Sequence, residues 1–384
     1  MESGIVTQML RQPGPGGASV EAGGVDRVRP MTEPDLARVL ELYRRVFPGR
    51  DAGGLRPVEK HLRDVLSGNP WRNETMPSLV YEDGAGRIAG CLGVMPRPMS
   101  FGGRPIQAAI SHTFMVEPGS RSSLAALALA RAFLSGGQDL SIAEGGGPSR
   151  RILERFGGST SLLLSLRWTR PLRPGRYLLS LLKRRGLAAP LRWALAPLGA
   201  AADALAPAFL GRTARLAPPR EAGEELTTGD LLECMSRVCA DRSLCPTYDS
   251  NALDWLLDLL AKGQGRGALQ RVGVRDGLGE MVGWYIYYLN PGGISEVVQV
   301  GAGKMFVEEV LDHLFHHAWR GGALAVSGQL DPGIFQALAA KGSVFHHDGV
   351  SWFLIHSRDP AVLAAIHRHD AFLTRLEGEW CIGP

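Results

Sequence analysis

Residues 106–134, IQAAISHTFMVEPGSRSSLAALALARAFL, decide the fold. Ile106–Val116 is rich in β-branched and apolar residues and predicts a long strand. Pro118-Gly119 ends it, and Ser122–Leu134 predicts a helix of alanine and leucine. Leu140–Ala143 then predicts another strand. This strand–loop–helix–strand segment is the centre of the first half of the chain.

The elements on either side of this segment complete a mixed unit. Upstream, apolar residues at helical spacing follow Thr32-Glu33, and Asp83-Gly84 predicts the turn of a hairpin. The expected order is strand, helix, helix, three antiparallel strands, helix, strand, helix and strand. The elements outside residues 106–143 are expected as helices at Leu36–Val46, Pro57–Leu66 and Ser149–Phe156 and strands at Ser78–Tyr81, Ile88–Val94 and Ser161–Trp168.

A similar order of elements returns in the second half, without obvious sequence identity to the first. Asn290-Pro291-Gly292-Gly293 predicts a turn between two of its strands. Helices are expected at Asp230–Val238, Ala252–Leu260, Phe306–Trp319 and Pro332–Ala340, and strands at Leu269–Val274, Met281–Leu289, Ile294–Val300, Ala323–Val326, Val344–His346 and Ser351–Ile355.

Length and composition bound the class of protein. A chain of 384 residues predicts two domains, and 45% apolar with 21% charged residues is ordinary for a globular protein. Five cysteines argue against a disulfide scaffold. No apolar run is long enough to span a membrane, and the first residues lack a secretory signal, so we expect a cytoplasmic protein.

A basic stretch separates the two halves. Residues 167–220 carry eleven Lys and Arg against one acid, Asp203, a net charge of +10, whereas the whole chain is +4. Frequent prolines there prevent a long helix. We expect a flexible tail at 1–26, a first domain at 27–170, a basic connector of short helices at 171–222 and a second domain at 223–384.

On these elements the chain resembles the GNAT N-acyltransferase superfamily, as two copies in tandem. The resemblance covers residues 28–170 and 224–357 and implies an α+β fold. Each domain would hold a mixed, mostly antiparallel sheet flanked by helices. It also implies an acyl-CoA co-substrate, whose pyrophosphate binds where the fourth strand meets the next helix. A helix N-terminus offers unpaired N–H groups to such an anion.

The resemblance implies a cofactor loop in each half. The family pattern (R/Q)-x-x-G-x-(G/A) places Arg121 at its first position and Ala126 at its last, with Leu124 where glycine is expected. The second half has the small residues of Val300-Gly301-Ala302-Gly303 and then Lys304. The candidate cofactor-binding residues are Met115, Val116, Arg121, Ser122, Ser123, Leu124, Ala125, Ala126, Val300, Gly301, Gly303 and Lys304. A plain glycine-rich turn is the alternative in either half.

Catalytic candidates also follow from the resemblance. The family carries a general base on its fourth strand, which implies His112 in the first half and Glu296 in the second. Both side chains can accept a proton near neutral pH when their surroundings allow it. The tyrosine that the family uses as a general acid is replaced by leucine in both halves. Tyr285 or Tyr287 could take its place, and core packing explains these residues equally well.

Other ligands receive less support. His313 and His317 stand four residues apart, but no third ligand is evident, so we expect no metal. No recognition motif for nucleic acid is present. Residues 173–192 combine leucines with Lys and Arg, which indicates a peripheral membrane contact or a connector that is solvated on one face.

Three functional hypotheses follow. The first is an acyl-CoA-dependent N-acyltransferase that moves an acetyl group, or another acyl group, to an amine of a small-molecule or glycan acceptor. The second is a non-catalytic binding scaffold that keeps the fold, because both loops and both acid positions are degenerate. The third is an aminoacyl transferase of the Fem type, which resembles tandem GNAT proteins but usually carries a coiled-coil arm.

Overall fold

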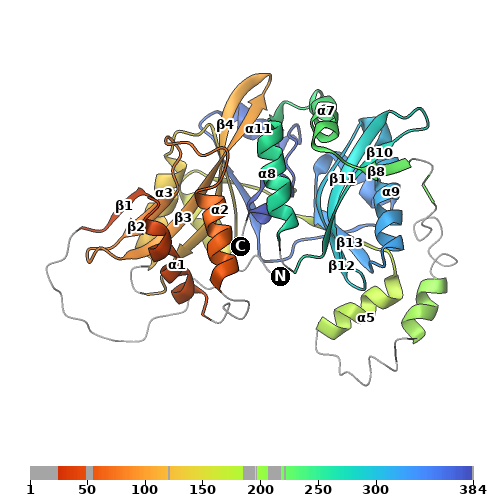
Figure 1. The fold of residues 1–384 in the computed structure, drawn as a ribbon, viewed down its shortest axis with the longest axis horizontal. Helices are drawn as coiled ribbons and strands as arrows, with labels where there is room; N and C mark the ends of the chain where they lie inside the picture. The colour runs from red at the N-terminus through yellow and green to blue at the C-terminus, as the bar shows by residue number, and fades with distance from the viewer. Residues whose placement is uncertain are drawn as a thin grey trace.

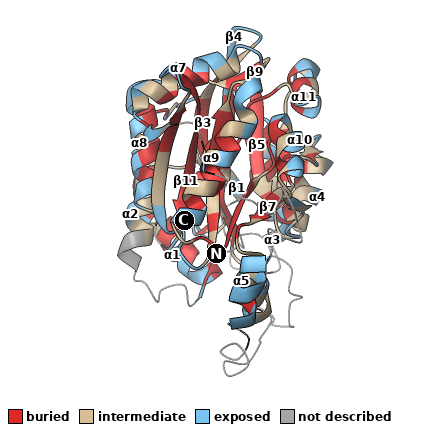
Figure 2. Cartoon of the chain, turned by 90° about the vertical axis from the view of Figure 1, so that its right-hand side faces the viewer, coloured by how far each residue is buried: buried red, intermediate tan, exposed pale blue. Residues whose placement is uncertain are grey.

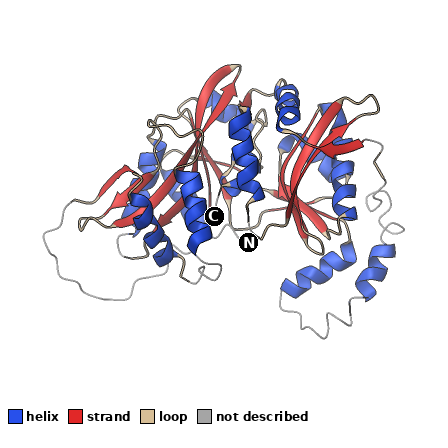
Figure 3. Ribbon diagram, in the orientation of Figure 1, coloured by secondary structure: helices blue, strands red, loops and turns tan. Residues whose placement is uncertain are grey.

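Two mixed β-sheets stand side by side with helices between and around them in the computed structural model (Figures 1 and 3). The structure describes residues 25–48, 55–119, 122–184, 195, 197–205, 218–219, 222–263 and 265–382. Most of the expected tail, and residues 185–194 and 206–217 of the expected connector, lie outside these ranges.

The first sheet has the order β1-β2-β3-β4-β5-β15-β6, and β9 adds to the free edge of β3. Its neighbours are antiparallel except for β4 and β5, which are parallel. Its strands are β1 Arg27–Pro30, β2 Leu79–Glu82, β3 Ile88–Phe101, β4 Arg104–Val116, β5 Leu140–Gly145, β6 Ser159–Ser161, β9 Leu244–Pro246 and β15 Trp352–His356.

The second sheet has the order β14-β7-β13-β12-β11-β10-β8, and its one parallel pair is β12 with β13. Its strands are β7 Arg167–Pro171, β8 Ala222–Glu225, β10 Ala268–Arg275, β11 Met281–Leu289, β12 Ile294–Ala302, β13 Ala325–Gln329 and β14 Val344–His346.

Helices cover both faces of each sheet. α1 packs on one face of the first sheet and α3 on the other, while α9 covers the outer face of the second. The helices are α1 Asp35–Val46, α2 Leu55–Leu66, α3 Ser122–Leu134, α4 Gly147–Arg155, α5 Pro174–Arg184, α7 Thr228–Cys239, α8 Ser250–Ala261, α9 Val307–Arg320, α10 Phe335–Ala340 and α11 Pro360–His367, with short 3₁₀ turns η3 Lys304–Phe306, η4 Pro332–Ile334, η5 Arg375–Glu377 and η6 Glu379–Cys381.

The deciding segment folds as its sequence predicts. Residues 104–116 form β4, and the predicted helix Ser122–Leu134 has the bounds of α3. The α+β class with two helix-flanked sheets is confirmed as well. The predicted strand Ser161–Trp168 is wrong, because a turn at 162–165 divides it into β6 and β7.

The two sheets exchange strands. β7 belongs by sequence to the first half, yet it lies between β13 and β14 of the second sheet. β15 comes from the second half and lies between β5 and β6 of the first. The proposed boundary at residue 170 therefore divides the sequence but not the sheets, because the first sheet also takes β9 and β15 from beyond it and the second takes β7.

The inner faces of the sheets share one hydrophobic core. It includes Met95 of β3, Leu256 of α8, and Trp284, Ile286 and Tyr288 of β11. Tyr285 and Tyr287 lie in the separate core under α9, so the alternation of faces along this strand is as expected. Burial of these apolar faces holds the two sheets together around the segment described next.

Candidate functional site

Each sheet contains one pair of parallel strands that separate after three residue pairs. β4 and β5 pair only at Ala108–Ile110 with Leu140–Ile142, and we call the opening beyond them the first fork. β12 and β13 pair only at Ile294–Glu296 with Ala325–Ser327, which defines the second fork. Backbone groups that line a fork lack a ladder partner and need another one.

The end of the described chain enters both forks. Residues 371–382, which we call the strap, are almost entirely buried and contain η5 and η6. η5 contacts β12, and η6 contacts β4 and β5. A capping box holds η5, in which Thr374 and Glu377 bond reciprocally.

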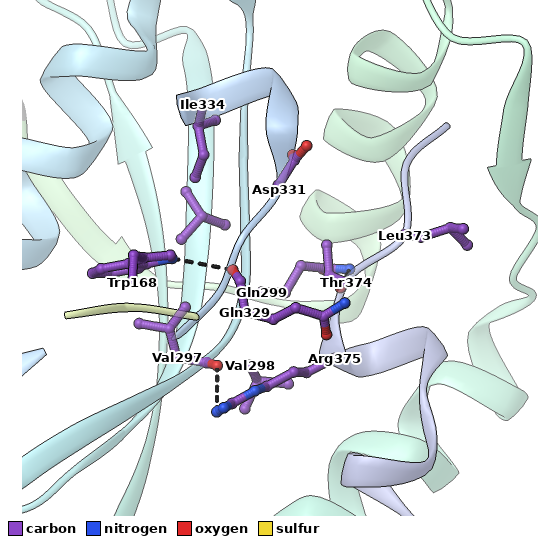
Figure 4. A pocket seen from close by; sticks show the side chains of 11 residues that line it. Trp168, Val297, Val298, Gln299, Gln329, Asp331, Ile334, Leu373, Thr374 and Arg375 are labelled. Atoms are coloured by element: carbon purple, nitrogen blue, oxygen red, sulfur yellow. Dashed lines mark hydrogen bonds between the residues drawn. The ribbon is translucent and has the colours of Figure 1, made fainter. Parts of the chain in front are cut away.

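At the second fork the strap bonds to the open edge of β12. Arg375 donates from Nη1 to the carbonyl of Val297 at 3.3 Å, and Gln299 Nε2 donates to Thr374 Oγ1 at 3.2 Å. Figure 4 shows these side chains around the space that remains. That space is a cavity of about 20 Å³, enough for one water molecule.

The same arginine joins an ion pair at the base of the second fork. Glu296 lies 2.6 Å from Arg375 Nη1 and 2.7 Å from Arg167 Nη2. Burial opposes the charge of Glu296, but the two guanidinium groups outweigh it and lower the pKa of this carboxyl. Burial in turn lowers the pKa of Arg375 to about 10. Glu296 is thus a paired anion and a weak base.

At the first fork a bulge turns one backbone N–H out of the ladder. Thr113 has φ of +51°, which is rare for a β-branched residue, and the register of β4 against β3 shifts beside it. Its N–H donates to Glu379 Oε1 of the strap at 3.2 Å. Strained backbone of this kind concentrates at functional sites.

A second carboxylate faces the strap from β5. Glu144 Oε1 accepts from the N–H of Trp380 at 3.4 Å. Burial raises the pKa of Glu144, and burial together with the charge of Glu144 raises that of Glu379 well above its usual range. The two acids therefore disfavour double ionisation, and the first fork holds carboxyl groups whose pKa values are raised.

His112 lies beside the bulge but is sealed from solvent. Its ring lies against Gly93, where an added Cβ would be 2.3 Å from Cε1. Nδ1 is 3.0 Å from Thr113 Oγ1, and Nε2 has no partner among the residues that the structure describes. Burial, with smaller effects from His61 and Arg97, lowers the pKa of His112 to about 3. The ring is neutral and helps to position the bulge.

The tyrosine candidates lie on the face that α9 covers. The hydroxyl of Tyr285 is 2.8 Å from His313 Nδ1 and 3.0 Å from His317 Nδ1, and that of Tyr287 is 3.4 Å from the same atom of His317. Burial raises the pKa of both phenols. These contacts give the tyrosines a packing role and no support as a general acid.

The start of α3 carries no acidic side chain, and Ser122 bonds back to the carbonyl of Gly119 through its N–H. Ser122 and Ser123 occupy its first turn without an acidic residue, and Leu124 is 61% exposed. Ala125 and Ala126 instead pack in the core, as do Met115 and Val116 at the end of β4. Arg121 lies outside the described residues. The helix dipole and the absence of an acid in the first turn make this end suitable for an anion.

The matching position of the second half is less suitable. Gly301 makes room for Trp284, whose ring would be 2.2 Å from an added Cβ, and Gly303 N–H bonds to Val282. Lys304 pairs with Asp241 at 3.1 Å. Glu308 and Glu309 occupy the first turn of α9, and their charge opposes an anion there. Val300 is buried in the core beneath α9.

Comparison with solved structures places this geometry in a known fold. The chain superposes on a GCN5-related N-acetyltransferase from Anabaena variabilis ATCC 29413 with a TM-score of 0.56, at 10% identity, over 87% of this chain and 73% of that one. A GCN5-related N-acetyltransferase from Kribbella flavida gives 0.51, at 15% identity, over 88% and 73%. The chain has the GNAT fold.

A third structure with a similar fold contains a long-chain acyl-CoA. Saccharomyces cerevisiae N-myristoyltransferase with bound myristoyl-CoA gives a TM-score of 0.50, at 11% identity, over 91% of this chain and 82% of that one. No protein-family model matches the sequence, and a search of curated proteins finds no significant relative. At these identities, the shared property is the GNAT fold.

Sequence reasoning missed the residues that meet at the first fork. Thr113, Glu144 and Glu379 lie far apart in the chain, and only the folded strap brings them together. One signal was available, because Glu144 follows a predicted strand and precedes three glycines in a GNAT-like segment. No local signal marks Glu379, whose role depends on where the strap docks.

The neutral state of His112 predicts a specific pH dependence of stability. The native ring resists protonation down to about pH 3, whereas the unfolded chain binds a proton near pH 6.5. Its contribution is therefore complete above pH 6.5 and is lost as the pH falls toward 3. Between pH 7 and pH 4.5, we expect the free energy of unfolding of His112→Gln to fall by about 2 kcal/mol less than that of the parent. Urea unfolding at several pH values measures this. His367→Gln, at an exposed site on α11, is the control, and a difference between parent and His112→Gln that stays constant with pH contradicts the assignment.

Proposed function

We propose that this protein is an acyl-CoA-dependent N-acyltransferase whose reaction takes place at the first fork. The observation that carries the proposal is the N–H of Thr113, which leaves the ladder and points at a carboxyl group between two separated strands. A donor of this kind can stabilise the oxyanion formed when a thioester is attacked. The bound myristoyl-CoA of the yeast neighbour supports an acyl-CoA as co-substrate.

Acyl-CoA fits the first half better than the second. The pyrophosphate would lie at the N-terminus of α3, where the helix dipole is positive and no acid stands in the first turn. The thioester would then reach Thr113 along the open edge of β4. In the second half, Glu308 and Glu309 repel phosphate, and the strap leaves space for one water at the fork.

In this mechanism the thioester oxygen replaces Glu379 as the acceptor of the Thr113 N–H. The released carboxylate takes a proton from the attacking amine while its nitrogen bonds to the thioester carbon. Collapse of the tetrahedral intermediate breaks the C–S bond, and the departing thiolate is protonated by the carboxyl pair or by water. Burial and the charge of Glu144 raise the pKa of Glu379, which makes its carboxylate a stronger base.

The surroundings favour a short acyl group and a cationic acceptor. Thr113, Glu144 and Glu379 make the first fork polar, which suits acetyl better than a long chain. The same acids attract a protonated amine. A small-molecule or sugar-type amine is therefore the acceptor that we propose, with acetyl-CoA as donor.

One observation favours a second candidate, a non-catalytic scaffold. The strap fills both forks and bonds to β4, β5 and β12. A protein that never opens its forks would keep the fold for binding or assembly alone. Cofactor binding separates the two candidates.

Two matched substitutions that introduce a carboxylate can assign the acyl-CoA binding site to one half. Leu124 and Met305 are both exposed. Leu124 lies at the start of α3, which follows β4, and Met305 lies in η3, which follows β12. We expect Leu124→Glu to weaken acetyl-CoA binding by roughly tenfold or more, because a carboxylate at the N-terminus of α3 repels phosphate. Isothermal titration should find Met305→Glu equal to the parent. The reverse pattern would move the site to the second half, and a parent that binds no acyl-CoA would favour the scaffold.

Replacement of the proposed base tests the chemistry. Glu379→Gln can still accept from the Thr113 N–H but cannot take a proton, so we expect acyl transfer to fall about 100-fold with little change in acetyl-CoA affinity. The parent rate should rise with pH through the raised pKa of the carboxyl pair, and the variant should lose this rise. A thiol-release assay with a panel of amines measures both. Glu233→Gln on the exposed face of α7 is the control. A variant that keeps both the rate and the pH profile excludes Glu379 as the base.

A further inference from the structure

Two helices project from one end of the molecule as a hairpin. They are α5 and the helix at 197–205, and we call them the basic hairpin (Figure 1). Gly175 packs directly against the second helix, where an added Cβ would be 2.3 Å from the carbonyl oxygen of Gly199. Asp203 accepts from Gly175 N–H at 2.7 Å and from Arg176 Nε at 2.6 Å. The two helices therefore form a defined unit.

Arg173 joins the hairpin to the body. It donates to the carbonyl oxygens of Trp319 and Ala323 at the end of α9, and its guanidinium lies 5.4 Å from the Trp319 ring centre. This attachment orients the hairpin rigidly at its base. Figure 2 shows the basic hairpin below the sheets, and its helix at 197–205 is largely exposed, in contrast to the buried strands above it.

Large apolar side chains of the hairpin face solvent. Leu178, Leu198 and Leu205 are 57%, 64% and 55% exposed, and the neighbouring Trp319 is 38% exposed. Leu198 and Leu205 are seven residues apart, so they share one face of their helix. Apolar surface on a projecting element, with a tryptophan beside it, is typical of an interaction site.

The charge of this region is one-sided. The sequence of residues 167–220 has a net charge of +10, although Arg167 pairs with Glu296 in the second sheet and Arg176 pairs with Asp203, the single acid, inside the hairpin. Lys183 on α5 and Arg320 at the end of α9 have no ion-pair partner among the residues that the structure describes. A cationic surface with exposed leucines and a tryptophan matches an anionic lipid surface, where apolar side chains enter the headgroup layer and Lys and Arg meet the phosphates.

We propose that the basic hairpin binds the protein to the surface of anionic membranes. The contact is peripheral, since no described helix is long and apolar enough to cross a bilayer. Leu178, Leu198 and Leu205 supply the apolar contact, and Lys183 and Arg320 supply the attraction. This binding is independent of the chemistry proposed at the first fork, so either proposal can fail alone.

Vesicle sedimentation with the full chain tests the proposal. We expect the pelleted fraction of the protein to be roughly tenfold higher with vesicles of phosphatidylcholine and phosphatidylglycerol at a 7:3 ratio than with phosphatidylcholine alone. High salt should release the bound protein. Lys183→Glu should weaken this binding by roughly fivefold or more. The double variant Leu178→Ser and Leu205→Ser should weaken binding to a similar degree, because each substitution removes apolar area that would enter the lipid.

Matched variants away from the hairpin provide the control. Lys262→Glu on α8 makes the same charge change, and Leu278→Ser removes a leucine that is 90% exposed in the β10–β11 turn. Both should bind vesicles as the parent does, and thermal unfolding should show that all variants remain folded. Equal binding to neutral and anionic vesicles, equal loss in the controls, or sedimentation of the parent without vesicles through self-association would each overturn the proposal.

Discussion

The structure depends on one constraint. Where two parallel strands separate, their backbone groups lose their ladder partners and must bond elsewhere. Both sheets contain such a pair, and a single buried segment at the end of the described chain enters both openings. Arg375 and Thr374 bond to the edge of β12, and Glu379 accepts from the bulged Thr113 of β4. The strap thereby links the two sheets, in addition to the exchange of β7 and β15 between them.

The two forks differ in charge, and this difference suggests a division of roles. In the second fork, Glu296 is held between Arg167 and Arg375, so its charge is compensated and its pKa is low. In the first fork, burial raises the pKa of both Glu144 and Glu379, the charge of Glu144 adds to the rise at Glu379, and the bonded partners are backbone N–H groups. A compensated ion pair stabilises a structure, whereas a carboxyl pair with raised pKa values can transfer protons. Together with the acids at the start of α9, this is why we propose the chemistry in the first half.

Local patterns predicted the elements well but not the contacts at the two forks. Proline and glycine fix the ends of β4 and α3, so their bounds follow from sequence. The pairing of β7 with β13 joins residues about 160 positions apart, and nothing in the sequence RWTRP indicates which sheet it enters. The catalytic candidates His112 and Glu296 were placed beside the two forks, but burial and ion pairing leave them unsuited as bases. Such effects depend on the tertiary surroundings, which a single sequence does not contain.

A crystal structure of the protein with acetyl-CoA tests the central claim most directly. The account predicts pyrophosphate at the N-terminus of α3 and the thioester oxygen within hydrogen-bond distance of the Thr113 N–H. Glu379 would be displaced from that donor while Arg375 stays paired with Glu296. Coenzyme A at the start of α9, or a complex in which the thioester lies away from Thr113, would contradict it.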